Sequence, residues 1–162
     1  MKGIAIIAIF TIIVLIGSGC EKEPPSGHIS LYVTYPEAVV VPDQPLSFIQ
    51  VPASGAEARL YDNDAQCWGI RDARADVAWI DGKPTGSIYV QRSNEKGVAV
   101  FNDIPAGEYY LVVYAKQLYK YTEKYIEVYS GDTLKLTKDF TADLGYSNGL
   151  EPWDYVMPPL KK

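Results

Sequence analysis

Apolar and polar residues alternate along most of the chain with a period of two. Between positions 28 and 35, the apolar residues Ile29, Leu31 and Val33 are separated by single residues, which is typical of a half-buried strand. Gly, Pro, Asn and Asp interrupt this alternation at close spacing. The pattern predicts an all-β sandwich of short strands, with further strands at or around 56–61, 76–80, 87–92, 98–101, 109–115, 126–128 and 134–136.

Two segments depart from the alternation. Residues 36–54 contain four prolines, so Pro36 is expected to end the first strand and to begin a long crossing segment, with a short edge strand at 38–41. Residues 62–75 show no regular period and are expected to form a loop or an insertion.

The stretch NEKGVAVFNDIPAGEYYLVVYA, residues 94–115, contains glycines at two turns. A phosphate-binding loop would lead from a strand into the N-terminus of a helix, where free N–H groups face the anion. Gly97 and Gly107 instead lead into strands, so we interpret them as hinges between strands. The alternation assigns four side chains of this stretch to the core: Phe101, Tyr109, Leu111 and Val113.

The N-terminus indicates export from the cytoplasm. Residues 1–19 consist of a charged start, an apolar run and small residues, as in a secretory signal. Ser18-Gly19-Cys20 resembles the lipobox of bacterial lipoproteins, which implies cleavage before Cys20 and a lipid, such as palmitate, on that residue. The alternative is an uncleaved N-terminal anchor, and either arrangement holds the protein at a membrane.

Residues 20–27 are charged and then rich in Pro and Gly, so we expect a tether between the anchor and the domain. The charged run after Cys20 also resembles the export signal of surface lipoproteins from Bacteroidetes-type bacteria. The expected location is therefore the outer membrane, on its periplasmic or surface face.

The charge of the chain bears on its partners. The 162 residues have a formal net charge of −5, and removal of Lys2 with the signal makes it more negative. An acidic chain without a basic cluster argues against nucleic acid as a partner. One domain is expected at 28–140, followed by a tail at 141–162 that docks on it through Trp153, Tyr155 and Val156.

A family resemblance rests mainly on residues 94–115. Gly97-x-Ala99-x-Phe101, followed by Ile104-Pro105-x-Gly107-x-Tyr109-x-Leu111-x-Val113, resembles the prealbumin-like (transthyretin-like) sandwich of carboxypeptidase regulatory-like and Cna B-type domains. The resemblance covers roughly 28–140 and implies a seven-stranded Greek-key sandwich that acts as an accessory, adhesive or spacer module without catalytic residues. Some Cna B-type domains form a Lys–Asn isopeptide bond between the first and last strands. Residues 28–35 contain no Lys and 132–140 no Asn, so no such bond is expected.

The residues give little support for catalysis, a cofactor or a metal. His28 is the only histidine, and no nucleophile motif accompanies it. Once Cys20 carries lipid, Cys67 is left unpaired and is expected to be a small buried residue. Four aspartates crowd one irregular region, where a solvated acidic loop is favoured over a calcium site: Asp62, Asp64, Asp72 and Asp76.

Outward-facing tyrosines are the candidate binding face. If Tyr109 and Leu111 point inward, the alternation places five tyrosines on the opposite face: Tyr89, Tyr110, Tyr114, Tyr125 and Tyr129. Such a face can stack on sugar rings or meet a partner protein. The alternative, which we favour, is that these tyrosines form cross-strand pairs or lie beneath the C-terminal tail.

Together these observations predict a membrane-anchored, non-enzymatic β-sandwich lipoprotein that acts as a protein-binding or structural module in a cell-envelope complex. The alternative is a carbohydrate-binding surface lipoprotein of a polysaccharide-uptake system that uses the outward tyrosines. A third and more remote alternative is a hydrolase based on paired carboxylates, whose separation a sequence does not show.

Overall fold

The computed structural model describes residues 25–63, 77–80, 83–142 and 149–154. Several expectations fall on residues outside these ranges: the signal at 1–19, the lipidated Cys20, Cys67, three of the four aspartates of the acidic loop (Asp64, Asp72 and Asp76), and Tyr155 and Val156 of the tail.

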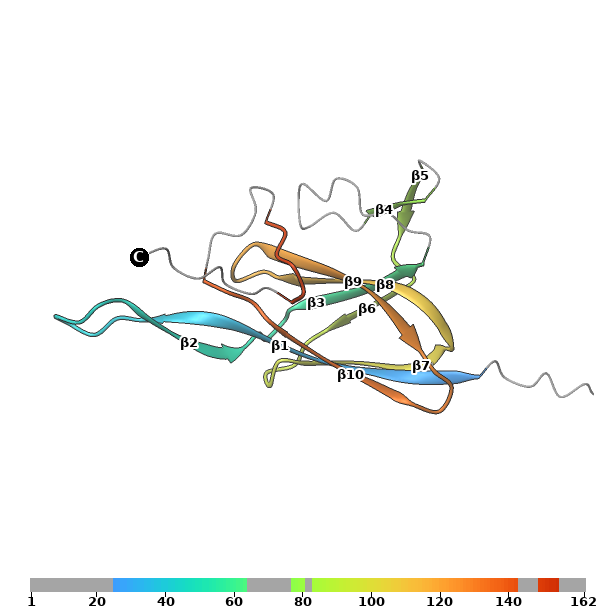
Figure 1. Ribbon diagram of the computed structural model, residues 1–162, viewed down its shortest axis with the longest axis horizontal. Coiled ribbons are helices and arrows are strands. Elements are labelled where there is room, and N and C mark those ends of the chain that lie inside the picture. Colours follow the sequence, from blue (N-terminus) through green and yellow to red (C-terminus); the bar gives the residue numbers. More distant parts are fainter. Residues whose placement is uncertain (1–24, 64–76, 81–82, 143–148, 155–162) are drawn as a thin grey trace, which may run out of the picture.

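The described residues form an all-β sandwich, which confirms the expected fold class (Figure 1). They contain no helix, and therefore none long and apolar enough to cross a membrane. Eight strands make two four-stranded sheets, one more strand than the family resemblance implies. The ten strands are β1 (Ser26–Val39), β2 (Ser47–Pro52), β3 (Glu57–Asp62), β4 (Val77–Ile80), β5 (Lys83–Gly86), β6 (Tyr89–Arg92), β7 (Val98–Pro105), β8 (Gly107–Ala115), β9 (Lys120–Val128) and β10 (Thr133–Asp139).

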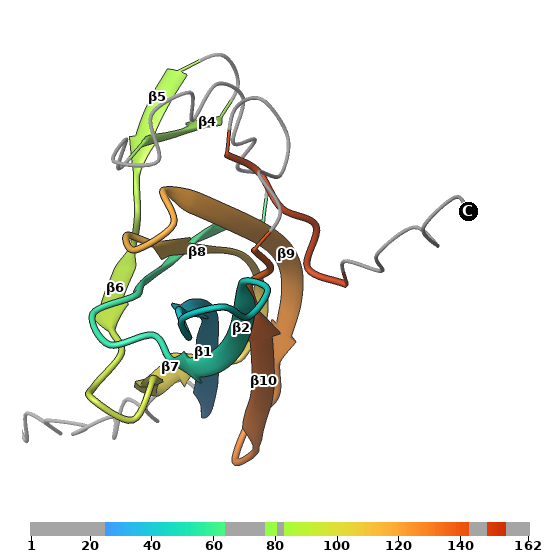
Figure 2. The same cartoon turned by 90° about the vertical axis from the view of Figure 1, so that its left-hand side faces the viewer.

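In the first sheet, the long strand β1 is the centre. It pairs in parallel with β10 on one side and antiparallel with β7 and β2 on the other. The second sheet is antiparallel, in the order β6-β3-β8-β9. β4 and β5 form a separate two-stranded sheet on the outer side of this second sheet (Figures 1 and 2).

The core lies between the two four-stranded sheets. Ile29, Leu31 and Val33 of β1 are fully buried there, opposite Leu60 of β3. All four core side chains expected in the 94–115 stretch are buried in the same cluster: Phe101, Tyr109, Leu111 and Val113.

The expectation for residues 36–54 is wrong. β1 continues through Pro36 to Val39, and β2 pairs with it antiparallel, so this segment is a hairpin rather than a crossing. Pro36 is tolerated because its backbone faces a side of β1 where no neighbouring strand needs an N–H donor. The N–H and C=O groups of Val33 face the side of β7 and β2, so alternation turns the backbone of Pro36 to the other side, past Thr34, where the pairing with β10 ends.

Gly97 has the hinge role that the sequence indicates. It adopts φ +75°, and a Cβ there would lie 2.5 Å from the carbonyl oxygen of Val33. The Asn94 side-chain oxygen accepts hydrogen bonds from the N–H groups of Lys96 and Val98, which closes the turn. Gly107 differs, because it has no positive φ and is simply the first residue of β8.

The C-terminal segment 149–154 closes one side of the sandwich beside β9 (Figure 2). Its Glu151 is fully buried and accepts hydrogen bonds from Lys120 Nζ at 2.9 Å and Lys138 Nζ at 2.8 Å. Lys120 begins β9 and Lys138 lies in β10, so one carboxylate joins the two sheets. The N–H and hydroxyl of Thr141 donate to the same carboxylate, and Trp153 packs against the core.

Replacing Glu151 with Gln should strongly destabilise the fold. Two buried lysines then lose their counter-charge, and breaking a buried ion pair from one side costs about 3–5 kcal/mol. The free energy of unfolding, measured by urea titration, should fall by that amount. Glu95→Gln, at an exposed turn position, is the matched control and should change it by less than about 0.5 kcal/mol. Equal stability of the two variants would contradict the structural role of Glu151.

The same carboxylate predicts a loss of stability in acid. Burial by itself raises the pKa of Glu151, but the hydrogen bonds from Lys138, Lys120 and Thr141 outweigh it, so the pKa lies below its ordinary value of 4.5. A group with a lowered folded pKa stabilises the protein fully above its unfolded pKa, and this stabilisation is lost as the pH falls through the folded value. The free energy of unfolding should therefore drop below about pH 4.5, and it should drop less steeply in Glu151→Gln. Identical slopes in the two proteins would refute the assignment.

Candidate functional site

The outer face of the second sheet holds five tyrosines in rows of directly opposed residues. The register gives three rows: Tyr61–Tyr110–Tyr125, Arg59–Val112–Glu123 and Glu57–Tyr114–Tyr121. Two of these tyrosines are not expected on this face from the sequence, Tyr61 of β3 and Tyr121 of β9.

Tyr110 points to this outer face, as its alternation with Tyr109 requires, but it is buried. Its ring lies 4.7 Å from that of Tyr125, edge to face at 60°. Tyr125 in turn is more than half exposed. The pair matches the cross-strand packing that we favour from the sequence, and Tyr110 is not accessible to a ligand.

The expected outward direction of Tyr89 is wrong. Tyr89 lies directly opposite Leu60 in the register, and directly opposed residues share a face, so Tyr89 packs against the core. Its neighbours Ile88 and Val90, on the other face of the strand, are about half exposed. Apolar residues stand at successive positions here, and the pairing with β3 rather than the local pattern decides which of them turn inward.

Tyr129 and Tyr114 lie apart from the Tyr110–Tyr125 pair and apart from each other. Tyr129 follows the end of β9, is exposed, and donates its hydroxyl to Glu127, a hydrogen bond that raises the pKa of Tyr129. Tyr114 lies near the end of β8 and lines a pocket. The five expected tyrosines therefore do not form one continuous surface.

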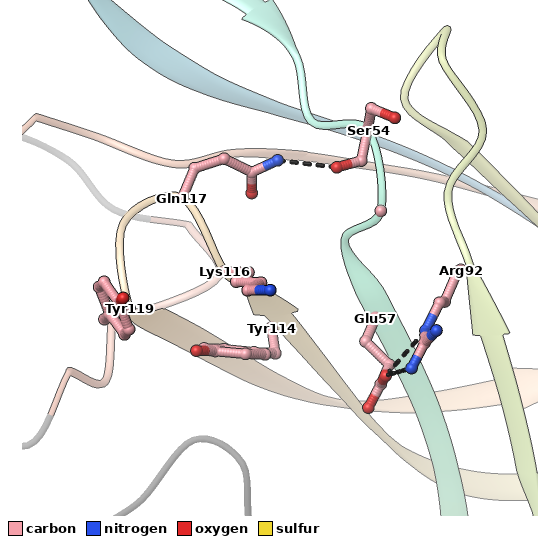
Figure 3. Close-up of a pocket in the computed structure, with 8 residues that line it drawn as sticks. Ser54, Glu57, Arg92, Tyr114, Lys116, Gln117 and Tyr119 are labelled. Carbon is pink, nitrogen blue, oxygen red and sulfur yellow. Dashed lines mark hydrogen bonds and ion pairs between the residues drawn. The ribbon is translucent and has the colours of Figure 1, made fainter.

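The pocket around Tyr114 has a volume of about 620 Å³, within the usual range for small-ligand sites. Three regions build it: the turn between β2 and β3 with Ser54 and Gly55, the paired strands β3 and β6 with Glu57 and Arg92, and the end of β8 with the turn that follows it. This last region supplies Tyr114, Lys116, Gln117 and Tyr119. In Figure 3, Tyr114, Lys116 and Tyr119 lie on one side of the hollow and Glu57 and Arg92 on the other.

Positive charge exceeds negative charge at this pocket. Glu57 Oε2 lies 3.1 Å from Arg92 Nε and 3.0 Å from Nη2, and Glu57 also pairs with Arg59. Burial by itself raises the pKa of Glu57, but the hydrogen bonds and charges of the two guanidinium groups outweigh it and lower the pKa. The lining thus has two cations, Arg92 and Lys116, and one carboxylate, which Arg59 also shares.

Contacts between turns fix the shape of the pocket. Gln117 Nε2 donates to the carbonyl oxygen of Ser54 at 2.7 Å, which ties the turn after β8 to the turn before β3. Tyr119 has φ +54°, an uncommon conformation for a residue other than glycine. Gly149 packs so close to it that a Cβ there would lie 2.7 Å from the Tyr119 carbonyl oxygen, so the C-terminal segment supports this turn.

The sequence did not indicate this pocket. Apart from Tyr114, its lining comes from turn residues and charged strand residues that show no motif or spacing. Pairing of β3 with β6 and β8 brings them together, and no single segment contains that information.

Metal-ligating and catalytic candidates are sparse in the described part of the chain. Within it, no three His, Cys, Asp or Glu side chains gather as a metal site. Asp62 lies exposed at the end of β3, and the other three aspartates of the expected acidic loop are outside the described residues. His28 Nδ1 accepts a long hydrogen bond of 3.4 Å from the Asp103 N–H.

A second candidate surface is the hairpin at the far end of β1 and β2, which we call the arm and define as residues 37–51. Figure 1 shows it projecting from the sandwich. Its exposed large apolar side chains range from 41% to 80% accessible: Val40, Val41, Leu46, Phe48 and Ile49. The base of the arm is fastened to the end of β10, because Gln50 Nε2 donates to the Phe140 carbonyl at 3.0 Å and the Thr34 hydroxyl to Asp139 at 2.6 Å.

No family model matches the sequence, and no curated protein matches it. Among solved structures, the minor pilin GBS52 of Streptococcus agalactiae is 13% identical, with a TM-score of 0.40 over 73% of this chain and 45% of the pilin. BcpA, the major pilin subunit of Bacillus cereus, is 22% identical, with a TM-score of 0.37 over 74% of this chain and 31% of the pilin.

A Pseudomonas aeruginosa protein for which carbohydrate binding has been suggested is 14% identical, with a TM-score of 0.37 over 72% of this chain and 91% of that protein. This chain thus spans less than half the length of either pilin. All three TM-scores are below 0.5, and no function follows from likenesses this distant.

Proposed function

We propose that this protein is a membrane-anchored, non-enzymatic β-sandwich lipoprotein that binds a protein partner in a complex of the bacterial cell envelope. A lipid on Cys20 holds it at the outer membrane, and the arm is the surface that meets the partner. The observation that supports this proposal is the exposure of large apolar side chains on a hairpin that projects from the sandwich and is fastened at its base.

Exposed apolar side chains on such a projection favour a protein partner. Monomeric proteins rarely expose contiguous apolar patches unless the patch serves an interaction. Burying one large aliphatic or aromatic side chain contributes ~1.5–3 kcal/mol, so covering five that are about half exposed contributes on the order of 5 kcal/mol. Association itself costs about 4–15 kcal/mol, so these side chains alone do not give a tight complex.

The edge of β2 supplies the additional contacts. Within the described residues, β2 pairs only with β1 and ends one side of the sheet. An edge strand presents unpaired N–H and C=O groups, onto which a partner can add a strand. Main-chain hydrogen bonds along β2 then add to apolar contacts with Phe48 on one face of the strand and Ile49 on the other.

The anchor is tested by metabolic labelling with palmitate in a bacterial host. Wild-type protein should incorporate the label and fractionate with membranes, because the lipid is attached to Cys20. Cys20→Ala should lose both the label and the membrane fraction. Cys67→Ala is the matched control, since it removes the other cysteine, and it should retain both. Label that persists in Cys20→Ala would overturn the anchor.

The arm is tested by purifying the protein from intact membranes after mild cross-linking. Wild-type protein should bring down a partner in stoichiometric amount, and Phe48→Ser with Ile49→Ser should lose most of it, since both the apolar contact and the fit along β2 weaken. The free energy of unfolding should stay within about 0.5 kcal/mol, because both side chains are already half exposed.

Ile88→Ser with Val90→Ser provides the matched control. These two side chains are as exposed as those of the arm but lie on the sandwich, so the partner should be retained. Retention of the partner in the arm variant, or its equal loss in both variants, would contradict the role of the arm. A second copy of this chain as the only cross-linked species would replace the envelope partner with self-association.

A further inference from the structure

The pocket at the turn between β8 and β9 combines three properties that bear on its ligand. It is concave, with a volume of about 620 Å³. It has an excess of positive charge, and it contains two tyrosine rings, Tyr114 and Tyr119, on one side (Figure 3). A ligand that uses all three properties is small, anionic and has a face that can lie against a ring.

The charged groups of the pocket suit a carboxylate. Arg92 directs Nε and Nη2 at Glu57, and a guanidinium has five N–H donors, so donors remain for a ligand. Lys116 lies across the hollow from this pair and offers a compact ammonium (Figure 3). Glu57 orients Arg92 but does not neutralise the site, because it is also shared with Arg59.

The tyrosine rings of the pocket suit a sugar. Tyr119 is 64% exposed, and its uncommon backbone conformation is supported by Gly149 rather than by burial of its ring. Tyrosine offers an apolar face and a hydroxyl, the combination that matches the C–H and O–H groups of a pyranose. Inorganic phosphate or a simple carboxylate would use the cations but leave the rings without a contact.

We infer that this pocket binds a carboxylate-bearing sugar, a uronic acid unit of a polysaccharide, with its carboxylate between Lys116 and Arg92 and its ring against Tyr119. None of the exposed apolar side chains of the arm lines this pocket, so the inference does not depend on the proposed protein partner.

The test is isothermal titration calorimetry of the full chain, purified in detergent, with a galacturonic acid trimer. The trimer should bind, and maltotriose, a neutral trimer, should bind at least about tenfold more weakly, because a hydrogen-bonded charged contact is lost. Raising the salt concentration should weaken the binding of the acidic trimer. Sodium phosphate and sodium acetate, which lack a sugar ring, should not compete at equal concentration.

Three variants separate the contribution of the lysine charge from that of the tyrosine ring to binding of the trimer. Lys116→Gln should weaken binding of the galacturonic trimer about tenfold by removing a charge, and Tyr119→Ala should weaken it comparably by removing the ring. Lys135→Gln, an exposed lysine of β10 in the other sheet, is the matched control and should leave binding unchanged. Unfolding midpoints of all three should match the wild type, which shows that the pocket variants fold.

Several outcomes would overturn the inference. These are no binding of the acidic trimer, equal binding of maltotriose, competition by acetate or phosphate at equal concentration, or unchanged affinity in Lys116→Gln. Loss of the protein partner in the arm variant with uronate binding intact would show that the two surfaces are separate.

Discussion

One buried carboxylate holds this sandwich closed. Glu151 lies between Lys120 of one sheet and Lys138 of the other, and Thr141 satisfies its remaining acceptor positions. Taking three charges out of water is costly, and it is tolerated only where each has its hydrogen bonds. Because the acid that neutralises the lysines comes from the C-terminal segment, the two sheets and that segment depend on one another.

The Glu151 cluster is also connected to both candidate surfaces, the pocket and the arm. Gly149, two residues before Glu151, presses on the carbonyl of Tyr119, so the segment that closes the core also supports the rim of the pocket. On the other sheet, β10 holds Lys138 and then ends beside Thr34 and Gln50, at the base of the arm. The arm and the pocket are thus both connected to the Glu151 cluster, the pocket through the C-terminal segment and the arm through β10.

The sequence predicts the core better than the surfaces. Phe101, Tyr109, Leu111 and Val113 are found because one face of an alternating strand must be buried. Pro36 misleads because whether a strand tolerates proline depends on where its neighbouring strand ends. Tyr89 misleads because its strand is apolar on both faces and pairing with Leu60 decides its direction. The Glu151 cluster gives no local signal, since lysines and glutamates are ordinarily expected at the surface, and the pocket residues converge only through strand pairing.

The length of β1 also has a mechanical meaning. Its 14 residues span roughly 45 Å at ~3.3 Å per residue, and they run from the N-terminal end of the sandwich to the arm at the opposite end (Figure 1). A force applied between the segment before Ser26 and a protein grasping the arm would act along this single strand. The tension would pass through the covalent backbone of β1, so the hydrogen bonds to β7 and β10, which lie across that direction, would not have to carry the load. β1 can therefore act as a tension-bearing rod between whatever holds the N-terminus and whatever holds the arm.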